Sequence, residues 1–187
     1  MAEEDKQIEA LMWASFEAEI PERLRRASSV RLQNIIPAHW FSAAASECAG
    51  MYIAGFFYGA ISMTQAYVEA LSKYLAEHHK IRVGKDVAER CRRLRDCDVL
   101  SAPGFDAATK ILNDRNDFHH LNKDVEQDFR KLEERAAECI NLLHLLESEV
   151  FAYSFASETP GQVVLSKPEY WPSPAPGQAN VHLRQLW

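Results

Sequence analysis

Six consecutive residues, Arg115 to His120, place a fixed cation, a carboxamide and two imidazoles within one short stretch of sequence. A guanidinium can neutralise a phosphate, and an imidazole can give or take a proton near neutral pH. Such a set needs no metal ion for either task. The segment Arg-Asn-Asp-Phe-His-His is therefore the candidate site, and its chemistry should centre on Arg115 and His120.

The position of Arg115 adds to this interpretation. Arg115 falls on a stripe of apolar residues at helical spacing, which are Phe105, Ala108, Ile111, Leu112 and Phe118. Burying an unpaired charge is very costly, so an arginine on such a stripe needs a partner or a role in chemistry. In the purely structural interpretation, Asp114, Asp117 or an acid on a neighbouring helix is the partner.

Helical geometry leaves two arrangements of this site open. Residues four apart share a helix face, whereas residues five apart do not. In the first, Arg115 and His119 form a pair on one face of the helix. In the second, Asn116 holds His120, and a helix end near Leu121 turns the chain so that Arg115 lies close to His120. Periodicity alone favours the first arrangement, in which the second imidazole belongs to a solvated helix terminus.

The elements that must position these residues are helices. Apolar periodicity predicts an all-α protein, a four- or five-helix up-and-down bundle, with helices over residues 3–32, 42–79, 85–95, 105–121 and 122–151. Pro21 is expected to kink or split the first helix, residues 35–40 to form a connector, and residues 102–104 to form a turn. The last helix should be capped by Asn122 or Asp124. Glycines weaken helices, so Gly50, Gly55 and Gly59 are expected to permit close helix–helix approach.

The composition changes after Phe151. Five of the eight prolines lie in the final 28 residues, at positions 160, 168, 172, 174 and 176. The sequence thus predicts a helical domain over residues 1–152 and an extended, Pro-rich C-terminal tail over residues 153–187. Residues 163–165 should make one short strand. Tyr170, Trp171 and Trp187 indicate that parts of the tail dock on another surface, which the sequence does not identify.

Charge and cysteine usage exclude several classes of function. The net charge of −6 argues against binding duplex nucleic acid through an overall positive field, but it allows a local basic groove. The four cysteines form no C-x-x-C pair, and we find no signal peptide, which indicates reduced thiols in a cytoplasmic protein. Cys91, Cys97 and the two His-His doublets match no standard zinc spacing, so neither metal nor cofactor is expected.

Residues 48–68 form an uncharged segment long enough to cross a membrane. Polar residues crowd its second half, and the apolar pattern continues past Val68 with polar residues between, as in a buried bundle helix. No Lys or Arg cluster sits beside either end. We therefore expect a buried central helix and no membrane partner. A small membrane-associated helical protein remains an alternative to this interpretation.

Seven cations fall within residues 80–95, including Arg92, Arg93 and Arg95, against only two acids. In an acidic protein this concentration suits a groove that follows a phosphate backbone. A solvated face explains most charge runs equally well. Lys73 and Glu69 form an ordinary i,i+4 pair on the preceding helix.

The placement of the Arg115 motif resembles a known family. Arg-Asn followed by three residues and His, just before a long amphipathic last helix, is similar to the R-x4-H motif of HEPN domains. The helix containing Glu69 and Lys73, a spacing similar to a polar pair in some members, resembles the HEPN helix that precedes the motif. The resemblance covers residues 42–151.

The resemblance implies an all-α domain of four or five helices and a metal-independent endoribonuclease, often a toxin or antiviral effector, that works as a dimer. It assigns catalysis to Arg115, Asn116 and His120. Many members have Gly after the His, whereas this chain has Leu121, which leaves His119 as the alternative imidazole. RNA contacts would come from Arg92, Arg93 and Arg95 together with Lys73 and Glu69.

The expected partners are a second copy of the chain, RNA and an antitoxin-like protein. Phe56, Phe57 and Tyr58, on a helix rich in Gly and Ala, expose more apolar surface than one bundle can cover. A homodimer burying on the order of 1,000 Å² or more follows from this. The alternative function is a non-catalytic dimeric interaction module built on the same bundle.

Overall fold

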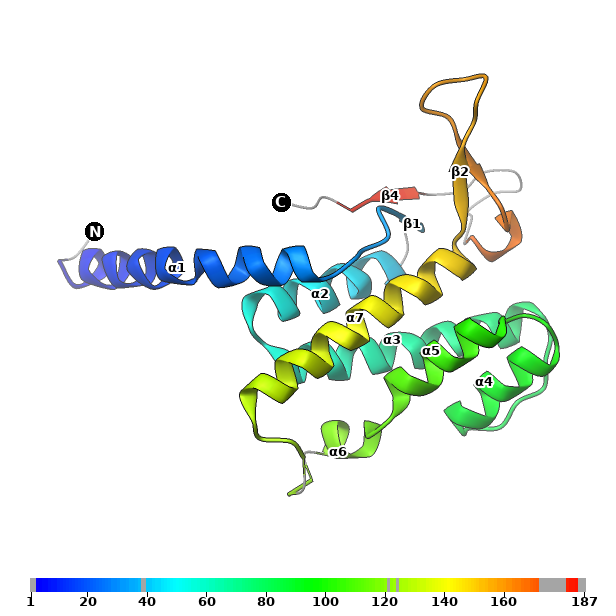
Figure 1. The fold of residues 1–187 in the computed structure, drawn as a ribbon, viewed down its shortest axis with the longest axis horizontal. Helices are drawn as coiled ribbons and strands as arrows, with labels where there is room; N and C mark the ends of the chain where they lie inside the picture. The colour runs from blue at the N-terminus through cyan, green and yellow to red at the C-terminus, as the bar shows by residue number, and fades with distance from the viewer. Residues whose placement is uncertain (1–2, 38–39, 121, 124, 172–180, 185–187) are drawn as a thin grey trace.

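The chain is predominantly helical, as the sequence predicts for an all-α protein (Figure 1). The computed structural model describes residues 3–37, 40–120, 122–123, 125–171 and 181–184. Its helices are α1 (Glu3–Ser29), α2 (Trp40–Ala54), α3 (Phe57–His78), α4 (Val87–Asp96), α5 (Ala102–Leu112), α6 (Arg115–His120) and α7 (Phe129–Val150). Its strands are β1 (Ile35–Pro37), β2 (Tyr153–Phe155), β3 (Val163–Leu165) and β4 (Val181–Leu183), and a 3-10 turn, η1, covers Pro168–Tyr170.

The core lies where α3 and α7 cross, with α2 and α5 packed on either side. Phe41 from α2, Tyr67 from α3 and Phe151 after α7 are fully buried there, and the Phe41 ring contacts the other two rings. The described part of α1 before residue 23 projects beyond this core, as Figure 1 shows at the blue end of the chain. The candidate site therefore depends on α3, α5 and α7.

The single helix predicted over residues 42–79 is wrong, because the chain breaks between α2 and α3. Gly55 adopts a φ of 86°, a left-handed conformation that glycine accepts without steric cost. The two helices then fold back on each other. Gly59 supports this close approach, since a Cβ there would lie 2.9 Å from the sulfur of Met51. Phe57 is buried by the pairing, whereas Phe56 is exposed.

The helix predicted over residues 105–121 is also divided, into α5 and α6. The expected turn at residues 102–104 is instead the first turn of α5, with Ser101 as N-cap accepting a hydrogen bond from the Gly104 amide at 3.1 Å. α5 ends at Leu112, because Asn113 leaves the helical conformation with a ψ of 141°, and Asp114 then adopts a φ of 59°. α6 therefore begins at Arg115 in a new direction.

The ends of the first and last helices also differ from expectation. α1 runs without interruption through Pro21 and ends at Ser29. α7 begins later than predicted, because the carboxylate of Asp128 caps it by accepting from the amides of Arg130 and Lys131. The helix end expected at Leu121 and the cap expected at Asp124 lie outside the described residues.

Two small antiparallel sheets hold the chain after α7. The strand predicted over residues 163–165 is confirmed as β3, and it pairs with β2. The predicted connector contains β1, which pairs with β4 from the end of the chain. Tyr170 and Trp171 are buried against the domain, so this part of the tail docks as expected, whereas Trp187 lies outside the described residues. Arg184, next to β4, donates to the carboxylate of Glu147 on α7 at 3.3 Å, and both side chains are almost fully buried.

Among the described residues, no helix is both long enough and apolar enough to cross a membrane. The uncharged segment over residues 48–68 is divided between α2 and α3 at Gly55.

Candidate functional site

Arg115 is held by an acid on a neighbouring helix. Its Nη2 donates to the Glu69 carboxylate of α3 at 2.6 Å, and each side chain is about one third exposed. Its Nε is buried and has no hydrogen-bond partner. The guanidinium is therefore fixed in direction and still reaches solvent. The expected Glu69–Lys73 pair is not formed. The Glu69 carboxylate pairs with Arg115 instead, and the Lys73 ammonium lies 3.9 Å from the carboxylate of Glu77.

The C-terminus of α5 is capped by two side chains that lie far away in sequence. Gln65 on α3 is fully buried, and its Nε2 donates to the carbonyls of Ile111 and Asn113, both at 3.1 Å. Arg135 on α7 donates to the carbonyl of Lys110 at 2.6 Å. Carbonyls at a helix end have no partner within the helix, so these contacts stabilise the end of α5. They thereby place Arg115 opposite Glu69.

Sequence reasoning missed both capping residues. Gln65 is one of the polar residues in the second half of the uncharged segment over residues 48–68. A polar side chain on a core-facing stripe is itself a signal that a buried partner exists. Arg135 carried no signal of this kind, because it sits on the polar side of a periodic helix.

The two imidazoles of α6 stand in different surroundings. His119 has a pKa below its usual value, first because burial penalises the imidazolium and then because Arg115 is close by. The carboxylate of Glu69 acts on His119 in the opposite direction. His119 therefore shares the electrostatic environment of Arg115 and Glu69, as residues four apart on a helix should. Both imidazoles are exposed, and His120 is the last residue of α6.

Phe118 anchors the short helix that carries these groups. It is buried, and its ring centroid lies 5.9 Å from that of Tyr58 on α3. The Tyr58 hydroxyl in turn donates to the carbonyl of Glu126 at 2.6 Å, which ties the loop after α6 to α3. α6 is thus attached to α3 at two points, Phe118 and Arg115.

A groove of about 660 Å³, here called the Arg115 groove, lies between α6 and the start of α4. Arg115, Asn116, Asp114 and Asp117 line it from the α6 side, and Lys85 is among the residues that line it from the other. His119 and His120 are not among its lining residues. The groove therefore presents both signs of charge.

A second depression of about 890 Å³ adjoins the first, because Glu69 and Lys85 line both. Its walls carry Lys73 and Arg82. Arg90 also lines it but is buried, and it donates to the Glu69 carbonyl and the Ser72 hydroxyl at 3.3 Å each. Arg90 thus joins α4 to α3.

The arginines expected to contact RNA lie on α4, outside the lining of both depressions. Arg92 forms an ion pair with Glu89, and Arg95 lies 2.9 Å from Asp96 with its guanidinium over the ring of Phe105. Arg93 is exposed. Of the cations, Lys85 lines the Arg115 groove itself, and Lys73 and Arg82 line the second depression.

Three of the four thiols, those of Cys48, Cys91 and Cys139, are buried. Over the described ranges, no group of three or more His, Cys, Asp or Glu side chains is placed to hold a metal ion. Burial raises the pKa of the Cys48 thiol to about 12 and those of Cys91 and Cys139 to about 11. A thiol is nucleophilic only when ionised, so these three cysteines are inert near neutral pH.

No family model matches this sequence, and neither a curated protein nor a solved structure matches the chain.

Proposed function

We propose that this protein is a metal-independent endoribonuclease of the HEPN type, which cleaves RNA through the substrate's own 2′-hydroxyl. The observation that carries the proposal is the Arg115 guanidinium, fixed by Glu69 at the wall of a groove. Asn116 lines the same groove, and two imidazoles follow on the same short helix. These are the groups that the R-x4-H motif would use.

In the proposed reaction, an imidazole removes the proton from the 2′-hydroxyl, whose oxygen then attacks the adjacent phosphorus. The bond from phosphorus to the 5′-oxygen breaks, and that oxygen receives a proton. The products are a 2′,3′-cyclic phosphate and a 5′-hydroxyl. Arg115 stabilises the charge that develops on the phosphoryl oxygens. His120 is the general acid or base, and its exposure at the end of α6 leaves it accessible to a substrate.

His119 is the alternative imidazole, and one observation favours it. Its pKa is lowered by burial and by Arg115, which keeps it neutral, and thus able to accept a proton, at neutral pH. Its location on the Arg115 side of α6 matches simple helical spacing. Substituting each histidine separately distinguishes the two assignments.

The fold that this proposal requires is a HEPN-like core formed by α2, α3, α5 and α7, with residues 153–187 as an extended tail. Catalysis is further proposed to take place in a cytoplasmic homodimer, in which the second copy supplies a complementary motif. An antitoxin-like protein is the proposed regulatory partner. The charges of Lys85, Lys73 and Arg82 beside the Arg115 groove support an RNA strand as the ligand.

A non-catalytic interaction module is the second candidate function. It is supported by the ion pair that neutralises Arg115 and by Asp114 and Asp117 in the same groove, since carboxylates repel phosphate. In this case Arg115 would be a structural arginine that joins α6 to α3.

A cleavage assay with defined ends separates the two functions. The purified protein should cut a single-stranded RNA in excess chelator and leave 2′,3′-cyclic phosphate ends. An RNA of the same sequence with 2′-deoxy sugars is the matched control, and it should remain intact because it lacks the nucleophile. Absence of cleavage across diverse RNAs at high protein concentration would favour the interaction module.

A further inference from the structure

An apolar surface of the described chain that no other element covers lies on α1, away from the residues that line the Arg115 groove. Every described side chain from Glu4 to Glu22 is exposed. The contacts that hold α1 on the domain come from its last turns, where Arg26 ion-pairs with Glu133 and Ser29 hydrogen-bonds to Tyr52. The preceding residues extend past the bundle (Figure 1).

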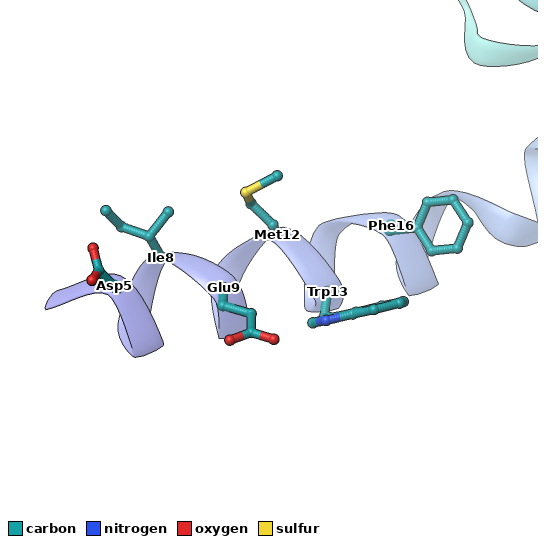
Figure 2. A pocket seen from close by; sticks show the side chains of 6 residues that line it. All are labelled: Asp5, Ile8, Glu9, Met12, Trp13 and Phe16. Atoms are coloured by element: carbon teal, nitrogen blue, oxygen red, sulfur yellow. The ribbon is translucent and has the colours of Figure 1, made fainter. Parts of the chain in front are cut away.

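This exposed helix carries a regular row of large apolar residues. The row steps by four residues through Ile8, Met12, Phe16, Ile20 and Leu24, with Trp13 beside it. Figure 2 shows Ile8 and Met12 pointing up from the helix and Glu9 and Trp13 pointing down. Between the Ile8–Met12 side and the Glu9–Trp13 side of the helix lies an open hollow of about 550 Å³, which is lined by residues of α1 only. A second helix would complete it.

An unpacked helix of this composition is poorly stabilised in water. Helices in proteins owe most of their stability to packing of an apolar face, and Pro21 removes one backbone hydrogen bond within α1. We therefore infer that α1 is an interaction surface, and we propose that its occupant is α1 of a second copy, lying antiparallel with the two Phe16 side chains at the two-fold axis.

The available area fits a stable dimer. The five apolar side chains of the row, and Trp13 as the sixth, are between 38% and 68% exposed. At roughly 200 Å² per large apolar residue, they present roughly 650 Å² per chain and about 1,300 Å² per pair. Stable interfaces bury about 1,200–2,000 Å² in total. The value of about 1,300 Å² is the most that these side chains can bury in a pair of α1 helices, since the row turns around the helix by about 40° at each step of four residues, and it lies at the lower end of the range.

Charge favours the antiparallel orientation, in which Arg23, paired with Glu19 of its own helix at 2.8 Å, gains a second acid. Glu9 and Arg23 lie seven residues before and after Phe16, about two helical turns, so all three side chains face the same direction. In an antiparallel pair centred on Phe16, Glu9 of each copy faces Arg23 of the other, and Met12 faces Ile20. A parallel pair would instead place Glu9 against Glu9 and Arg23 against Arg23, which is repulsive.

Light scattering on the full chain tests whether a second copy of the chain covers the apolar surface of α1. At tens of micromolar the wild type should have twice the 21.3 kDa mass of one chain. Phe16→Glu places two carboxylates at the axis and should raise the dissociation constant at least about thirty-fold, as expected when a central residue is lost. Ala14→Glu, which adds the same charge on the opposite side of α1, is the matched control and should remain dimeric. A monomeric wild type would overturn the proposal and leave this surface to a partner of another sequence, as would a Phe16→Glu variant as dimeric as the control.

Cross-linking tests the orientation. In a Cys97→Ser background, which removes the exposed native thiol, Glu9→Cys and Arg23→Cys variants are mixed and treated with a short bismaleimide. The antiparallel pair predicts Glu9→Cys to Arg23→Cys cross-links in the mixture and none in either variant alone. Efficient cross-linking of Glu9→Cys to itself would overturn the antiparallel arrangement. Neither measurement depends on ribonuclease activity.

Discussion

The buried ion pair between Arg184 and Glu147 gives a prediction whose size can be worked out from the structure. Arg184→Met removes the cation and leaves Glu147 almost fully buried on α7. Burial already raises the pKa of Glu147, and Arg184 is the main influence that lowers it. Without Arg184, the carboxyl group should take up a proton rather than remain charged in the core.

Protonation of Glu147 sets an upper bound on the electrostatic part of the stability that Arg184→Met loses. Bringing a carboxyl group with an ordinary pKa of 4.5 to its neutral form at pH 7 costs about 3.4 kcal/mol, at about 1.36 kcal/mol per pH unit. At pH 5 the same step costs about 0.7 kcal/mol. When the pKa of a carboxyl group is higher in the folded than in the unfolded state, the protein loses stability as the pH rises from the unfolded pKa to the folded pKa. The variant should therefore be strongly destabilised at pH 7 and only slightly at pH 5.

Urea unfolding followed by circular dichroism, at both pH values, measures this difference. Arg130→Met, at an arginine that is largely exposed and paired only with Glu134, is the matched control, and its stability should change by less than about 0.5 kcal/mol. An Arg184→Met variant that loses the same stability at pH 5 as at pH 7 would refute the reasoning. Such a result would mean that Glu147 does not become neutral.

Three further predictions concern other parts of the fold. In an NMR titration His119 should have a pKa below 6.5, and Arg115→Ala should raise this pKa, because the guanidinium disfavours the imidazolium. An unchanged pKa would show that the charge of Arg115 does not act on His119. Because its folded pKa is depressed, the stability that His119 contributes is present above pH 6.5 and falls as pH drops toward the folded value. Of the four thiols, Cys97 alone should react rapidly with a thiol reagent in the native protein, and all four in denaturant; more than one fast thiol would contradict the burial of the others. Gly104→Ala should destabilise, because its Cβ would displace the Glu149 carboxylate of α7 from its hydrogen bonds to the Ser101 amide and hydroxyl. Gly50→Ala, whose Cβ meets nothing within 4 Å, should be neutral or stabilise by up to about 1 kcal/mol; equal effects would show that Glu149 moves aside without cost.

The helices could be predicted from apolar periodicity, but their breaks could not. The row from Phe57 to Leu75 continues the pattern of α2 in phase, so the turn at Gly55 leaves no mark on it. The end of α5 depends on Gln65 and Arg135, which are distant in sequence. The pairing of β1 with β4 is likewise non-local, and three residues are too few to show a strand period.

The candidate site was predictable in its residues and less so in its contacts. The sequence placed Arg115 on a core-facing stripe and required a partner for it, and the structure supplies Glu69, 46 residues away. Local spacing had paired Glu69 with Lys73 instead. The arginines of α4 illustrate the same limit, because a charge run in sequence does not determine which cations line a groove.

The most direct test of the central claim is RNA cleavage in chelator by wild type and three variants of equal helical content. The account predicts that wild type cuts, that Arg115→Ala and His120→Ala do not, and that His119→Ala retains most of the activity. Arg130→Ala, an exposed arginine on α7, is the control and should cut as wild type does. An active Arg115→Ala variant would contradict the account, because no other group has been assigned to the developing phosphoryl charge.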